Sequence, residues 1–125
     1  MQRIKLCEDI LINVNKITIR KCDRDKYIKF AKRLDKELRE KYGKYYICDQ
    51  VNESRDYPNI FYVEAFYRNI DGVYSESEKI SKFIEQEYEN EFGDDIERIT
   101  LTTFREVNKV YPISKNNCEC EEEKE

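Results

Sequence analysis

The sequence has no histidine and no tryptophan, and it has only three glycines and two prolines among 125 residues. Without histidine, Ser-His, Cys-His and His-metal chemistries are excluded. Gly43, Gly72 and Gly93 each suit a helix end or a turn, so no glycine-rich loop is left to cradle a phosphate. No stretch approaches the ~18 uninterrupted apolar residues of a membrane span, and residues 1–10 do not resemble a secretory signal. We therefore expect a cytoplasmic protein that does not engage a membrane.

The sequence has five cysteines. Their odd number and their irregular spacing both disfavour a disulfide framework. Cys22 falls where a predicted strand meets a helix N-terminus, but Asp23 and Asp25 oppose a thiolate at that place. Cys118 and Cys120 supply two of the roughly four ligands of a zinc site. We therefore expect no metal, no cofactor and no catalytic residue, and the sequence predicts that the protein is not an enzyme.

Charge is abundant and unevenly distributed. Charged residues make up 40% of the chain, and the net charge is -4. Residues 1–50 hold 14 Lys and Arg against 8 Asp and Glu, whereas residues 51–125 hold 9 against 19. A basic first half and an acidic second half point to a protein that recognises another macromolecule through its charges.

Hydrophobic periodicity predicts six elements in the order β-α-β-β-α-β. Residues 10–20 alternate as a strand, with a shift of phase near Asn15 and Lys16 that indicates a bulge or a turn. Helical spacing over 24–42 ends at Gly43. A second helix over 76–92 begins at a capping box formed by Ser75 and Glu78. The remaining strands are predicted over 44–51, 59–69 and 97–107.

This order predicts an α+β protein with a ferredoxin-like sandwich, in which two helices cover one face of a four-stranded antiparallel sheet. Residues 1–112 should form a single domain. Residues 113–125 have few large apolar side chains and end in an acidic cluster, so they are predicted to be a disordered acidic tail.

The strand at 59–69 carries four aromatic rings on two faces. Alternation assigns Phe61 and Tyr67 to the core and leaves Tyr62 and Phe66 on the open face of the sheet. We expect Tyr62 and Phe66 to pack against a partner protein, a second copy of the chain in a homodimer, or a terminal segment.

Acidic side chains line the polar face of the second predicted helix and extend past its end. Rows of carboxylates resemble a phosphate backbone electrostatically. The sequence is therefore interpreted as a small non-enzymatic protein-binding module, of the kind by which phages or mobile elements inhibit a host nucleic-acid enzyme in anti-defence. The acidic, nucleic-acid-mimicking residues are Glu78, Glu85, Glu89, Asp94 and Asp95.

The alternative places function on the basic helix at 24–42. Its polar face has a density of cations that suits a phosphate backbone. In this alternative the protein binds RNA or DNA, with Tyr62 and Phe66 stacking on bases. The candidate nucleic-acid-binding residues are Lys29, Lys32, Arg33 and Lys36.

Overall fold

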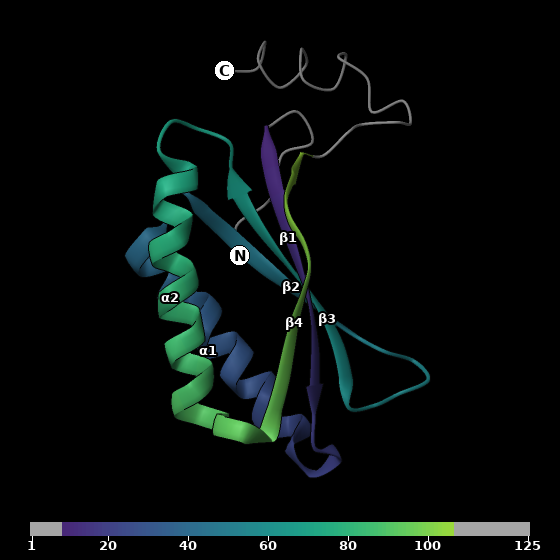
Figure 1. Ribbon diagram of the computed structural model, residues 1–125. Coiled ribbons are helices and arrows are strands. Elements are labelled where there is room, and N and C mark those ends of the chain that lie inside the picture. Colours follow the sequence, from purple (N-terminus) through teal and green to yellow (C-terminus); the bar gives the residue numbers. More distant parts are fainter. Residues whose placement is uncertain (1–8, 107–125) are drawn as a thin grey trace, which may run out of the picture.

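A computed structural model describes residues 9–106 and places six main elements in the predicted order (Figure 1). The predicted tail at 113–125 lies outside the described residues. Two short 3₁₀ turns, η1 and η2, precede the first helix and follow the second. The bounds are β1 Ile10–Ile19, η1 Lys21–Asp23, α1 Arg24–Tyr42, β2 Tyr46–Glu53, β3 Ile60–Arg68, α2 Val73–Phe92, η2 Gly93–Asp95 and β4 Ile96–Glu106.

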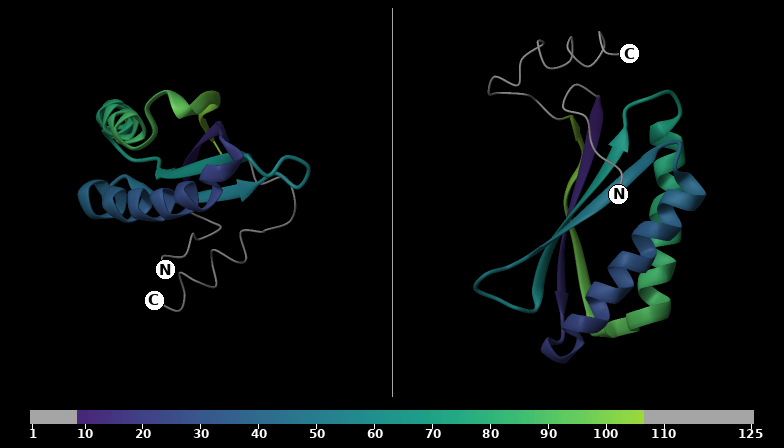
Figure 2. Two further views of the ribbon diagram at one scale, coloured as in Figure 1. Left: turned by 90° about the horizontal axis from the view of Figure 1, so that it is seen from below. Right: turned by 180° about the vertical axis from the view of Figure 1, so that it is seen from behind.

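The four strands form one antiparallel sheet in the order β2-β3-β1-β4. Both helices lie on the same side of this sheet, and within residues 9–106 the opposite face carries no helix (Figure 2). The predicted α+β ferredoxin-like sandwich is therefore confirmed. Strands β2 and β4 are the two edges of the sheet. Helix α1 meets the sheet at the β2 edge, and β4 forms the other edge.

Strand β1 departs from the prediction. It pairs with β3 without interruption from Ile10 to Thr18, so the bulge or turn expected near Asn15 and Lys16 is absent from this strand. The register shifts occur in the β1–β4 pairing, where β4 contributes the extra residues. The phase change arises because apolar residues occupy both faces of β1: Ile10, Ile12 and Val14 face away from the helices, whereas Leu11, Ile17 and Ile19 are buried in the core.

Helix α2 begins earlier than the capping box indicated. Its N-cap is Gly72, with a left-handed φ of 89°, and no side chain caps the helix there. Val73 is buried at the first helical position, so packing moves the start of the helix ahead of Ser75. Among residues 9–106, no helix combines the length and the apolar character that a membrane crossing requires.

The core between the helices and the sheet contains a cluster of aromatic rings among aliphatic side chains. Tyr27 of α1 packs on Phe61 of β3, with ring centroids 4.9 Å apart, and Phe30 meets Tyr88 of α2 edge to face at 4.9 Å. The buried hydroxyls of Tyr27 and Tyr88 share a hydrogen bond of 2.8 Å. This bond satisfies both polar ends inside an apolar environment and joins the two helices.

Alternation along β3 is as predicted, with Phe61, Val63, Ala65 and Tyr67 buried and the intervening residues more exposed. Phe61→Ala should therefore lower the free energy of unfolding by about 3–5 kcal/mol, because it opens a cavity in the aromatic core. Its neighbour Tyr62 is 39% exposed. Tyr62→Ala should cost less than about 1 kcal/mol. Urea unfolding of both variants measures the difference, and equal losses would contradict the assignment of faces.

Candidate functional site

The edge strand β2 is held to α1 at two separated points. At one point, the Arg24 guanidinium donates two hydrogen bonds to the carboxylate of Glu53, one of them 2.8 Å long. At the other, Asp35 of α1 binds Tyr46 and the backbone of Asp49. The strand is therefore anchored near both of its ends, and the stretch between the anchors faces the helix across a gap.

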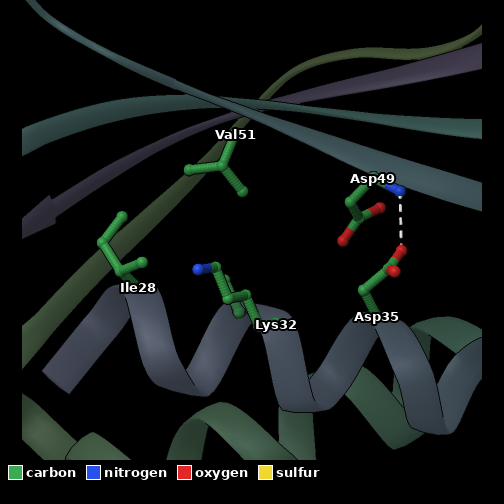
Figure 3. Close-up of a pocket in the computed structure, with 6 residues that line it drawn as sticks. Ile28, Lys32, Asp35, Asp49 and Val51 are labelled. Atoms are coloured by element: carbon green, nitrogen blue, oxygen red, sulfur yellow. Dashed lines mark hydrogen bonds between the residues drawn. The ribbon is translucent and has the colours of Figure 1, made fainter. Parts of the chain in front are cut away.

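That gap contains a pocket of about 280 Å³, which we call the α1–β2 pocket (Figure 3). Four of its residues lie on one side of α1, over two helical turns, and two lie at alternate positions on β2. The walls are mainly aliphatic, and the polar groups gather at one end and at the rim. The lining residues are Ile28, Ala31, Lys32, Asp35, Asp49 and Val51.

Asp35 fixes the polar end of the pocket. Its Oδ1 accepts a hydrogen bond of 2.6 Å from the Tyr46 hydroxyl and one of 2.9 Å from the backbone N–H of Asp49. Its Oδ2 accepts a third bond, of 2.9 Å, from Nε of Arg39 one turn along α1. Three donors therefore hold one carboxylate, which positions both the helix and the strand that carries Asp49.

The side chain of Asp49 points from β2 towards α1 beside Asp35 (Figure 3). Burial raises the pKa of Asp49 to about 7, and the negative charge of Asp35 adds to this shift. The Tyr46 hydroxyl and the Arg98 guanidinium oppose it. At neutral pH, Asp49 therefore exists in both protonated and ionised forms, which is the state that a general acid or base requires.

Tyr46 completes this end of the pocket. Its side chain is fully buried. Burial and the nearby carboxylates of Asp49 and Asp35 raise its pKa well above the ordinary value for tyrosine. Its hydroxyl therefore stays protonated and acts as a hydrogen-bond donor.

Lys32 reaches the pocket from the exposed side of α1. Its ammonium points towards the space between the helix and β2, with Asp49 on one side and Ile28 on the other (Figure 3). Among residues 9–106, no ion pair includes Lys32. A cation at the rim and a titratable carboxyl at one end therefore face the same small volume.

The predicted basic surface on α1 is divided. Lys29, Lys32, Arg33 and Lys36 are all exposed on the helix. Arg33 lies 3.3 Å from Glu37 and 3.4 Å from Glu91, so two carboxylates neutralise it. Lys32 turns to the pocket instead, and the four cations do not form one uninterrupted positive stripe.

The predicted acidic surface lies on the other helix. Glu78, Glu85 and Glu89 are exposed on α2, and Asp94 and Asp95 are exposed in η2. Asp95 is 3.4 Å from the guanidinium of Arg20. None of these five carboxylates lines the α1–β2 pocket, and their role in binding a partner stays a prediction.

Tyr62 and Phe66 lie on the sheet face that carries no helix, as their alternation predicted. Tyr62 is exposed and Phe66 is partly buried. Ile99 and Leu101 of β4 are also exposed, at 43% and 49%. A partner protein or a second copy of the chain on this face stays a prediction.

Sequence reasoning missed both Asp35 and Asp49, since carboxylates are common in this chain. One signal was available in the sequence. Asp49 and Val51 are two residues apart and so lie on the same face of their strand, and Asp35 follows Ile28 by seven residues and so lies on the same side of α1. Among the described residues, no group of three or more His, Cys, Asp or Glu side chains is arranged to hold a metal ion.

The fold is similar to that of two solved structures. One is described as a putative antibiotic biosynthesis monooxygenase from Nitrosomonas europaea; it matches with a TM-score of 0.54 and 8% identity over 89% of this chain and 100% of the other. The second has the same description and comes from Bacteroides thetaiotaomicron, with a TM-score of 0.54 and 13% identity over 82% of this chain and 97% of the other. No family model and no curated protein matches the sequence.

These comparisons contradict the interpretation of the chain as a non-enzymatic inhibitor, because both proteins that share the fold are described as enzymes. They give no support to an anti-defence role or to nucleic-acid mimicry. Binding of a nucleic acid by the basic helix stays a prediction. At such low identity the likeness establishes the fold alone. The absence of histidine does not exclude proton-transfer chemistry, because a carboxyl group in an aliphatic pocket can carry a proton near neutral pH.

The raised pKa of Asp49 makes stability depend on pH. The folded state favours the neutral carboxyl, so this stabilisation is complete below the ordinary pKa of 3.8 and is lost as the pH rises through about 7. Across that window the wild type should lose a few kcal/mol relative to Asp49→Asn, at about 1.4 kcal/mol per unit of pKa shift. Urea unfolding at a series of pH values measures this, with Asp56→Asn in the exposed β2–β3 loop as the control. Parallel curves for the wild type and Asp49→Asn would contradict the assignment.

Removal of the Asp35 carboxylate should weaken the anchor between α1 and β2. Asp35→Ala leaves the buried Tyr46 hydroxyl and the Asp49 N–H without an acceptor, which should cost about 2–3 kcal/mol. Glu40→Ala, an exposed change on the same helix, should cost less than about 0.5 kcal/mol. Thermal and urea unfolding of both variants compare the two losses. A loss for Asp35→Ala no larger than that of the control would show that the anchor is dispensable.

Proposed function

We propose that this protein is an enzyme that acts on a small, mainly apolar organic molecule bound in the α1–β2 pocket, with Asp49 as its general acid–base. The observation that carries the proposal is the position of Asp49. A carboxyl group with a pKa of about 7 lies at the wall of a pocket lined by aliphatic side chains and held open between two anchors. Pockets of this kind, with a few polar groups that converge on an apolar volume, are typical of small-molecule sites.

The lining defines the class of substrate. Ile28, Ala31 and Val51 offer a surface for an apolar body. The volume of about 280 Å³ lies near the lower end of the range for small-molecule sites. Lys32 at the rim can balance a negative charge that develops on the substrate. The substrate we infer is a compact molecule with a C–H or O–H bond that is acidified by a neighbouring carbonyl or aromatic group.

Asp49 would exchange a proton with that bond. In its ionised form it accepts the proton, and the resulting negative charge moves onto the substrate oxygen. The exposed Lys32, which lines the same pocket, would stabilise that charge. Asp35 acts as a positioning residue, because it holds the backbone of Asp49. Burial keeps the pKa of Asp49 high, and the charge of Asp35 adds to that effect. A general base that is placed in this way typically contributes about 10²–10⁴-fold to the rate.

The likeness in fold supports a small organic substrate. The two similar structures are described as putative antibiotic biosynthesis monooxygenases, a description that refers to the chemistry of small molecules. For this chain we propose the proton-transfer step only, because it is the step for which the pocket provides residues.

Proton transfer can be measured directly as exchange of hydrogen for deuterium at the α carbons of cyclohexanone and acetophenone in deuterated buffer. The wild type should accelerate exchange of at least one of these ketones, and the rate should rise with pH through about 7 as Asp49 ionises. Asp49→Asn should lower the rate by about 10²–10⁴-fold. Lys32→Met should lower it about tenfold.

Three controls separate the chemistry from a general loss of structure. Asp56→Asn and Lys36→Met change the same residue types outside the pocket and should leave the rate unchanged. Ala31→Leu fills the pocket without touching Asp49 and should abolish saturation by the ketone. The proposal fails if neither ketone exchanges faster with the wild type than with Asp49→Asn.

A further inference from the structure

A second hollow lies on the opposite side of the molecule, between the end of α2 and the start of the edge strand β4. It has a volume of about 260 Å³ and no residue in common with the α1–β2 pocket. We call it the α2–β4 hollow. Its lining residues are Glu85, Tyr88, Glu89, Gly93, Ile96 and Arg98.

Arg98 reaches the hollow from the sheet. It pairs with Ile17 in the β1–β4 register, and Ile17 is fully buried beneath the helices. The Arg98 side chain therefore starts on the core side of the sheet, and its guanidinium lies 5.3 Å from the ring centroid of Tyr88. Packing on this buried ring holds the guanidinium at the wall of the hollow, where it is partly shielded from water.

Glu85 and Glu89 stand one turn apart on α2 and border the same hollow. Among residues 9–106, the ion pairs include neither of these glutamates and do not include Arg98. Three charges of both signs therefore surround one small volume without contacting one another. Arg98 acts on Asp49 only through the longer-range charge interaction that opposes the raised pKa of Asp49. A partly buried guanidinium that forms no ion pair with a carboxylate gains most from a ligand that supplies one.

The end of α2 keeps this volume open. Gly93 has a φ of 54°, and its N–H donates to the carbonyl of Glu89. A Cβ added at Gly93 would meet no atom within 4 Å, so the hollow extends past this residue. Ile96 supplies an apolar wall next to the charged groups.

We propose that the α2–β4 hollow binds a free α-amino acid. The carboxylate of the ligand would pair with the Arg98 guanidinium, its ammonium with Glu85 and Glu89, and its side chain would lie against Ile96. A simple anion would be repelled by the two glutamates, and a simple cation would leave the Arg98 guanidinium without a carboxylate. The end of a peptide presents only one of the two charges, so the arrangement selects a molecule that carries both on one carbon.

The test compares L-leucine with two analogues that each lack one charge. The analogue 4-methylpentanoate lacks the ammonium, and 3-methylbutylamine lacks the carboxylate. In ¹⁵N-resolved NMR titrations of the full chain up to about 10 mM, leucine should shift the amides of Gly93, Ile96 and Arg98 in a saturable manner. Each analogue should bind at least about tenfold more weakly, since it forms only one of the two charge contacts.

Variants assign the contacts. Glu89→Gln and Glu85→Gln change exposed residues and should each weaken leucine binding severalfold, whereas Glu78→Gln, elsewhere on α2, should leave it unchanged. Arg98→Gln should abolish saturation, and the spectrum itself shows whether this variant is folded. Ala31→Leu, which fills the α1–β2 pocket and lies outside the α2–β4 hollow, should bind leucine as the wild type does, which separates this site from the proposed enzyme function.

Saturable leucine binding that is lost in Arg98→Gln and weakened in Glu89→Gln supports the proposal. Three results would overturn it: the absence of saturable shifts with leucine, equal binding of leucine and 4-methylpentanoate, or leucine binding that Glu89→Gln and Glu85→Gln leave unchanged. Equal binding of leucine and 4-methylpentanoate would indicate a site for anions. Leucine binding that both glutamate variants leave unchanged would show that the ligand does not contact the glutamates.

Discussion

The carboxylate of Asp35 is the interaction on which the proposed site depends. It accepts hydrogen bonds from the buried Tyr46 hydroxyl, from the backbone of Asp49 and from Arg39, and so it ties the middle of α1 to the edge strand β2. An edge strand has one unpaired side and is held less firmly than a central one. With Asp35 at one point and the Arg24–Glu53 contact at the other, β2 is fixed while the space between stays open. Burial raises the pKa of Asp49, and the negative charge of the same Asp35 carboxylate adds to this shift.

The aromatic core complements this arrangement. Tyr27, Phe30, Phe61 and Tyr88 fill the middle of the sandwich, where the Tyr27–Tyr88 hydrogen bond joins the two helices. Large rigid rings fill the centre, and the hollows occur at the two edges of the sheet, beside β2 and beside β4. Each hollow brings acidic and basic side chains around a partly apolar volume. These two hollows are the places at which we propose that small molecules bind.

The sequence predicted the fold well because its strongest signals are local. The apolar spacing of residues 24–42 and the glycine that follows gave α1 its observed bounds, and alternation gave the faces of β3. The sequence-based prediction was wrong where packing prevailed over the local pattern. Val73 is buried and α2 starts there, ahead of the Ser75 capping box. Strand β1 has apolar residues on both faces and pairs with β3 without a bulge.

The site was not predicted, for a different physical reason. An aspartate in a charge-rich chain resembles any surface carboxylate, and only the meeting of α1 with β2 distinguishes Asp49 from the others. The abundance of acidic residues on α2 directed attention to an extended electrostatic surface. The decisive features were two partly buried hydrogen bonds of Asp35, with partners that lie 11 and 14 residues further along the chain.

The central claim is that the fold holds a carboxyl group near neutral pKa in an aliphatic pocket, and a carboxyl ¹³C NMR titration of Asp49 tests it most directly. The account predicts that the Asp49 resonance titrates with a midpoint near the value of about 7 set by burial and by Asp35. A midpoint close to the ordinary value of 3.8 would contradict it, since Asp49 would then be a permanently ionised surface group.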